Sequence, residues 1–65
     1  MTLDIAHQHV TNAETRFWGA LVKRYGKRAG DMRYRTDILP ADILALAMAY
    51  QAACETWRAT FREAN

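Results

Sequence analysis

The stretch PADILALAMAYQAACETWRATFRE, residues 40–63, decides the fold because it reads as one long helix. Apolar side chains recur along it at three- and four-residue spacing, which is typical of a helix that buries one stripe. These residues are Ile43, Leu46, Ala47, Tyr50, Cys54, Trp57 and Phe61. Pro40 suits the first turn, where its missing N–H costs nothing, and the carboxylate of Asp42 complements the positive end of the helix dipole.

Within this helix, residues 43–50 (ILALAMAY) are apolar on every side. A helix that packs on a single neighbour needs one apolar stripe, whereas a helix that is apolar all round is surrounded by other elements. We therefore expect a second copy of the chain, or a partner protein, to pack against residues 43–54. The residues predicted to make this interface are Ile43, Leu44, Ala47, Met48, Tyr50 and Trp57.

A second long helix is predicted upstream, over about residues 3–28. Its apolar residues again follow three- and four-residue spacing. They are Leu3, Ala6, Val10, Ala13, Phe17 and Ala20. The helix has two candidate starts, because Thr11 and Glu14 form a capping box that would leave residues 1–10 as a separate arm. Gly26 and Gly30 are both candidate stops, since glycine takes the left-handed cap conformation at little cost.

Residues 29–39 connect the two helices. In this segment Met32, Tyr34, Thr36 and Ile38 alternate with charged residues. We interpret the alternation as an extended segment packed on one side, and no second strand accompanies it. The predicted fold is therefore all-α, with residues 1–65 as a single domain. It is an antiparallel hairpin of two long helices, about 3–28 and 40–63, that forms a helical bundle by homo-oligomerisation.

The size of the chain also favours assembly. A chain of 65 residues buries a modest core and is marginally stable without a disulfide, a metal or a partner. Its one cysteine, Cys54, excludes an internal disulfide. The N-terminus lacks the features of a signal peptide, and no apolar run approaches the ~20 residues that span a bilayer. We expect a cytoplasmic protein without a membrane partner.

The segment VKRYGKRAGDMRYR, residues 22–35, holds six basic side chains. Three interpretations stay open for it: a solvated helix end that balances the helix dipole, a surface for nucleic-acid phosphates, or a surface for an acidic protein. Tyrosine within the segment could stack on bases. A helix-turn-helix is excluded because the connection is too long for its tight turn. The candidate contact residues are Lys23, Arg24, Lys27, Arg28, Arg33, Tyr34 and Arg35.

Other residues give no sign of catalysis. His7 and His9 point to roughly opposite sides of a helix and cannot chelate one ion from it, so no metal site is predicted. Cys54 lies on the apolar stripe without a nearby base, and the chain has no serine. The aspartates near the connection have no glycine-rich phosphate loop beside them. We predict no enzyme activity, no cofactor and no small-molecule substrate. Trp18 and Trp57 are expected to anchor either the core or an interface.

The stretch LPADILALAMAYQAACETWRA, preceded by FWGALVKRYG, resembles the helical core of some phage small terminase subunits. The matching positions are Trp18, Asp42, Ala45, Leu46, Ala52 or Ala53, and Trp57. The resemblance spans residues 14–62, although the connection is longer here and no separate DNA-binding module is present. It implies an oligomeric helical hairpin, with a role in recognising viral DNA for packaging.

Two functions follow from these features. The first is a small, non-enzymatic phage or mobile-element protein that is homo-oligomeric and contacts nucleic acid through a basic edge. The second is a protein–protein module, a small inhibitor or adaptor that docks this edge on an acidic surface of a larger machine.

Overall fold

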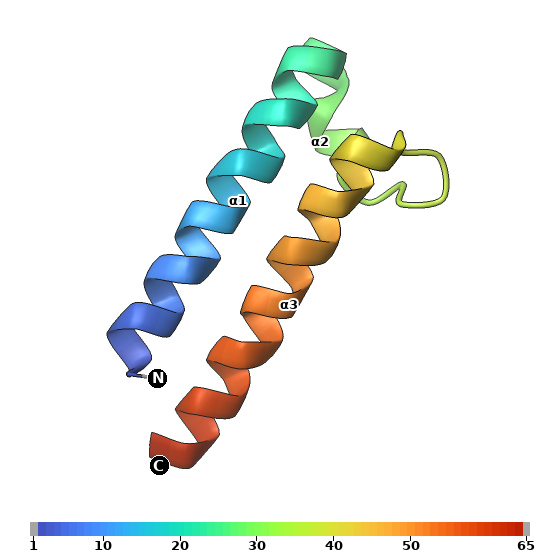
Figure 1. Cartoon of the computed structure of the whole chain (residues 1–65). Coiled ribbons are helices and arrows are strands. Elements are labelled where there is room, and N and C mark those ends of the chain that lie inside the picture. Colours follow the sequence, from blue (N-terminus) through green and yellow to red (C-terminus); the bar gives the residue numbers. More distant parts are fainter. Residues whose placement is uncertain (1, 65) are drawn as a thin grey trace.

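The computed structural model describes residues 2–64 as two long antiparallel helices joined at one end (Figure 1). The elements are α1 (Leu3–Tyr25), a 3₁₀ turn (Gly26–Arg28), the short α2 (Ala29–Met32) and α3 (Ala41–Ala64). No strand occurs among the described residues, so the all-α prediction is confirmed. We call the end that holds α2 the closed end, and the end near the two termini the open end. No helix within residues 2–64 has the combined length and hydropathy to cross a membrane.

The first helix begins at Leu3 and runs through Thr11 without a break. Thr2 is its N-cap, and the Thr2 hydroxyl accepts a hydrogen bond of 3.3 Å from the Ile5 N–H. The Thr11 hydroxyl instead donates to the His7 carbonyl at 3.1 Å, as a threonine inside a helix does. Of the two predicted starts, the structure therefore has the one at the N-terminal end.

Gly26 ends α1, and its N–H donates to the Val22 carbonyl. Its backbone has φ 59° and ψ −121°, which is the first central position of a type II′ turn rather than the predicted left-handed cap. Gly30 lies inside α2 and has no positive φ, so it does not stop a helix. The chain therefore reverses its direction through Gly26.

The connection after α2 is built from turns, and the prediction of an extended segment is wrong. The Arg35 N–H donates to the Met32 carbonyl, and the Ile38 N–H donates to the Arg35 carbonyl, both at 3.0 Å. Side chains in successive turns do not alternate between two faces. Tyr34 and Ile38 are accordingly exposed, and Leu39 is buried.

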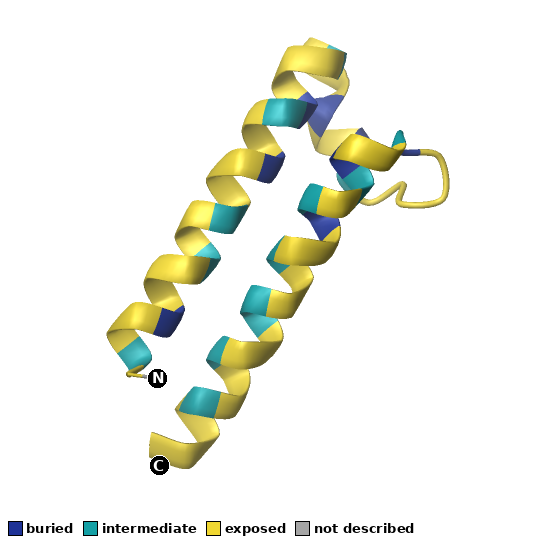
Figure 2. Cartoon of the chain, viewed as in Figure 1, coloured by how far each residue is buried: buried dark blue, intermediate teal, exposed yellow. Residues whose placement is uncertain are grey.

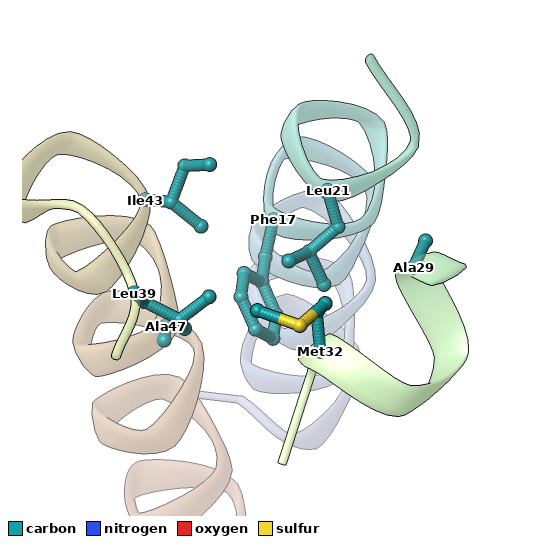
Figure 3. Packing of buried hydrophobic residues seen from close by; sticks show 7 residues of the cluster. All are labelled: Phe17, Leu21, Ala29, Met32, Leu39, Ile43 and Ala47. Carbon is teal, nitrogen blue, oxygen red and sulfur yellow. The ribbon is translucent and has the colours of Figure 1, made fainter. Parts of the chain in front are cut away.

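The core lies at the closed end, where four segments meet (Figure 3). It contains Phe17, Leu21, Ala29, Met32, Leu39, Ile43 and Ala47. Leu21 is fully buried, and the ring of Phe17 lies 6.2 Å from that of Tyr50 between centroids. α2 and Leu39 cover the gap between the ends of the long helices, so the connection is part of the core.

The open end is packed more thinly (Figure 2). Ala6 is the buried residue that α1 contributes there, and the opposing Trp57 is half-buried. Trp57 shares a hollow with His7 and Val10, so it faces the early part of the first helix. Its ring also stacks on Phe61 at 5.6 Å between centroids. These contacts involve small or partly exposed side chains, so they stabilise the open end less than the core stabilises the closed end.

Candidate nucleic-acid interface

Four exposed cations surround the tip of the closed end. Lys23 and Arg24 lie in the last turn of α1, and Lys27 and Arg28 lie in the 3₁₀ turn that follows. Within residues 2–64 the single ion pair joins Arg35 Nε to Asp37 Oδ1 at 3.6 Å. None of the four cations therefore has an ion-pair partner in the part of the chain that the structure describes.

Helix-dipole compensation accounts for only half of this cluster. Lys23 and Arg24 occupy the C-terminal turn of α1, where cations are favourable. Lys27 and Arg28 lie beyond that helix and directly before α2, where a cation gains nothing from a helix dipole. Helix-dipole compensation therefore does not account for the positions of Lys27 and Arg28.

The charge of the molecule is unevenly divided between its ends. Residues 22–42 carry six basic and three acidic side chains, whereas the rest of the chain carries three basic and four acidic ones. The closed end thus has an excess of three positive charges, and the remainder has an excess of one negative charge. A polyanion would be drawn to the closed end.

Arg33 is held differently from the other cations. Its guanidinium carbon lies 5.8 Å from the ring centroid of Trp18 and 5.5 Å from that of Tyr34, within the range of cation–π attraction. Arg33 is half-buried, whereas Tyr34 is 79% exposed. Arg33 is therefore fixed between two elements, and its neighbour presents an open aromatic ring.

Arg35 is free to exchange its partner. Its side chain is 57% exposed and that of Asp37 is 68% exposed. Ion pairs in such surroundings contribute about 0–1 kcal/mol. A phosphate or a carboxylate of another molecule could therefore replace Asp37 at little cost.

A small hollow lies beside Arg33 and Tyr34. Its volume is about 140 Å³, and it is lined by Phe17, Arg33, Tyr34, Thr36, Ala47, Tyr50 and Gln51. Phe17 and Ala47 are core residues, whereas Thr36, Tyr50 and Gln51 bring polar groups. Burial, together with the hydrogen bond to the neighbouring Cys54, raises the pKa of the Tyr50 hydroxyl.

One stripe of exposed residues along α3 is uncharged, and exposed charged residues of the same helix border it: Asp42, Glu55, Arg58, Arg62 and Glu63. We define the α3 outer face as seven exposed residues at helical spacing: Ala41, Ala45, Met48, Ala49, Ala52, Thr56 and Ala59. Met48 is 61% exposed, and the others have short side chains. A solvent-facing side of a helix is normally polar, so this face is unusual.

The predicted interface residues divide between the two sides of α3. Ile43 and Ala47 are buried in the hairpin's own core, and a second copy cannot reach them while the hairpin stays folded. Leu44, Tyr50 and Trp57 are half-buried, whereas Met48 lies on the α3 outer face. Ala45, Ala49 and Ala52 of this face lie within the predicted range 43–54 but were not among the residues named for the interface. Their exposure is evident only once the direction of α1 is known.

The residues considered for catalysis or metal binding stay apart. No group of three His, Cys, Asp or Glu side chains able to hold a metal ion occurs among residues 2–64. His7 and His9 are exposed on α1, and Cys54 is half-buried on α3 beside Tyr50.

Comparison with protein-family models, with curated proteins and with solved structures gave no match for this chain. The resemblance to phage small terminase subunits therefore stays a prediction.

Proposed function

We propose that this chain is a non-enzymatic binding protein that contacts nucleic acid through its closed end and associates with further copies through the α3 outer face. The observation that carries the proposal is the cluster of four exposed cations without ion-pair partners, Lys23, Arg24, Lys27 and Arg28. Packaging of viral DNA is one role that such a protein could have.

Phosphate binding would account for the cluster of exposed cations. Each cation that neutralises a phosphate releases a condensed counterion, and this release drives association at low salt. The four exposed residues lie within residues 23–28 at the closed end, so one nucleic-acid backbone can contact more than one of them. Arg35 adds a fifth cation when it leaves Asp37.

The large accessible surface area of a single chain supports self-association. The accessible surface of the chain is 4921 Å². A compact monomer of 7.5 kDa exposes about 4,250 Å² by the usual scaling with mass. The elongated hairpin, with extents of 39 × 18 × 17 Å, thus exposes about 670 Å² more than a compact monomer of its mass. The α3 outer face, with Glu55 beside it at helical spacing, is the surface that we assign to this contact.

The alternative function is a protein–protein module. An apolar face close to a charged rim is the usual anatomy of a protein interface, and the α3 outer face and the closed end have that arrangement. In this case the same arginines would pair with carboxylates of an acidic partner.

The test is the binding of fluorescent oligonucleotides, measured by anisotropy at 50 and 200 mM salt. With four phosphates contacted per chain, affinity should fall about 50-fold for a single strand and about 150-fold for a duplex over this range. The variant Lys27→Glu with Arg28→Glu should lose this binding. The matched control is Arg58→Glu with Arg62→Glu, which makes the same charge change near the open end.

Binding that does not respond to salt, or equal losses in the two double variants, would contradict the nucleic-acid proposal. Absence of oligonucleotide binding, together with a stoichiometric acidic protein recovered at low salt and lost in Lys27→Glu with Arg28→Glu, would favour the alternative.

A further inference from the structure

We propose that the hollow beside Arg33 and Tyr34 takes up one unpaired base, so that the nucleic acid bound by this chain is single-stranded. The inference rests on the proposed function, because it requires that nucleic acid be the ligand of the closed end. It adds a site and a class of nucleic acid that the cation cluster alone does not specify.

The size of the hollow suits one planar ring. Its volume is about 140 Å³. A cavity of about 150 Å³ lined by apolar side chains is large enough to bind benzene. Phe17 and Ala47 supply an apolar surface here, and both belong to the core and are held in place by it. The hollow is therefore preformed in the folded hairpin.

Stacking surfaces lie at its edge. The Tyr34 ring is 79% exposed, so a ligand can reach it. The guanidinium of Arg33 is oriented by Trp18 and Tyr34 together. Aromatic rings and arginine planes are the groups on which proteins stack the bases of single strands.

Polar side chains are among the residues that line the hollow. Gln51 carries an amide with donors and an acceptor, and Thr36 carries a hydroxyl, whereas the Tyr50 hydroxyl already has Cys54 as a hydrogen-bond partner. Such groups hydrogen-bond the edges of bases. In a duplex the faces of the bases are stacked on one another, so only an unpaired base could enter a hollow and stack on Tyr34.

Two arginines, Arg28 and Arg35, lie near the residues of the hollow in the sequence. Both belong to the closed end of the molecule. Arg35 follows Tyr34 directly, and its pair with Asp37 is exposed and weak. Arg28 lies at the start of α2, whose end leads into Arg33. A strand with one base in the hollow can thus place neighbouring phosphates on arginines.

The experiment compares three ligands of equal charge per strand at 50 mM salt: a thymidine decamer, an abasic decamer with the same phosphates, and a duplex. The thymidine strand should bind about tenfold or more tightly than the abasic strand, because stacking favours the intact bases. Tyr34→Ala should abolish this preference without changing the affinity for the abasic strand, and Tyr34→Phe should retain it.

The matched control is Ile38→Ala, which removes another exposed apolar side chain from the same connection, outside the lining of the hollow. Equal binding of the thymidine and abasic strands, or tighter binding of the duplex, would overturn the inference and leave the proposed function standing. If the chain bound none of the three ligands, the proposed function would be overturned as well.

Discussion

Gly26 is the residue on which the reversal of the chain depends. Its φ of 59° with ψ of −121° is accessible to glycine and strained for every residue with a Cβ. A methyl group added there would meet no atom within 4 Å, so any cost of substitution comes from the backbone alone. The neighbouring Gly30 has equal space and no positive φ.

These two glycines give a matched pair of variants. Gly26→Ala should lower the free energy of unfolding by about 1–3 kcal/mol, because alanine must adopt a strained conformation. Gly30→Ala should raise it by about 0.5–1 kcal/mol, because alanine favours a helix. Urea unfolding followed by circular dichroism measures both changes. Equal effects of the two substitutions would contradict the turn assigned to Gly26.

Tyr50 makes the stability of the hairpin sensitive to alkaline pH. Burial disfavours its tyrosinate form and raises the pKa of its hydroxyl above the ordinary 10.0. The folded chain therefore keeps a proton that the unfolded chain releases near pH 10. The resulting stabilisation is complete below that pH and is lost as the pH rises through the folded-state pKa.

Tyr50→Phe should reduce this sensitivity. The variant keeps an aromatic ring against Phe17 but has no proton to lose. Between pH 8 and pH 11 its melting temperature should fall less than that of the wild-type chain. The measurement is thermal melting by circular dichroism. An identical fall in the two proteins would show that Tyr50 does not contribute.

At the scale of elements, the two halves of α1 are held unequally. Its C-terminal half contributes Phe17 and the fully buried Leu21 to the core, whereas Ala6 is the buried residue of its N-terminal half. Local opening is easiest where few apolar contacts must be broken. The open end should therefore unfold locally more often than the closed end.

Hydrogen exchange within this single helix tests the difference. The amides of residues 6–12 should exchange about tenfold faster or more than those of residues 16–22, a ratio that corresponds to ~1.4 kcal/mol of opening free energy. Exchange read by mass spectrometry of overlapping peptides resolves the two segments. Uniform protection along α1 would contradict the thinner packing of the open end.

The long elements were predictable from the sequence because helical periodicity is a local signal. Apolar spacing predicted both long helices, whereas the start of α1 needed tertiary information. The sequence offers Thr11 as the cap of a later start, whereas in the structure Thr2 caps the helix and Ala6 is buried. The prediction of an extended connection was wrong because the turns of this segment depend on the space between two helix ends, which no local pattern encodes.

The candidate site could be predicted only in part, because some of its contacts join residues that are far apart in the sequence. The cation cluster is contiguous in the sequence and was evident there. The contact between Trp18 and Arg33 joins residues fifteen positions apart, and the hollow adds Gln51 from α3. These neighbours meet only because α2 folds back across the core.

At the scale of the whole molecule, the α3 outer face is the surface that we propose as the interface between copies. Met48 lies at the centre of the α3 outer face and is 61% exposed. A charge at this position can be solvated in a monomer, so it should not unfold the hairpin. In an interface the same charge would be desolvated without a counter-charge.

Met48→Glu should therefore weaken self-association by about 100-fold or more, while helix content stays unchanged. Gln8→Glu, which adds the same charge on the exposed side of α1, is the control and should leave the association constant as it is. Sedimentation equilibrium over a range of concentrations gives both constants. Equal association of the two variants would show that the contact does not involve the α3 outer face.

The central claim joins both surfaces: copies associate through α3, and the closed end binds nucleic acid. Native mass spectrometry of the purified chain with a thymidine decamer at low salt tests both parts together. The account predicts complexes whose masses contain two or more copies of the 7.5-kDa chain and at least one oligonucleotide. Single chains free of oligonucleotide at micromolar concentration would contradict it.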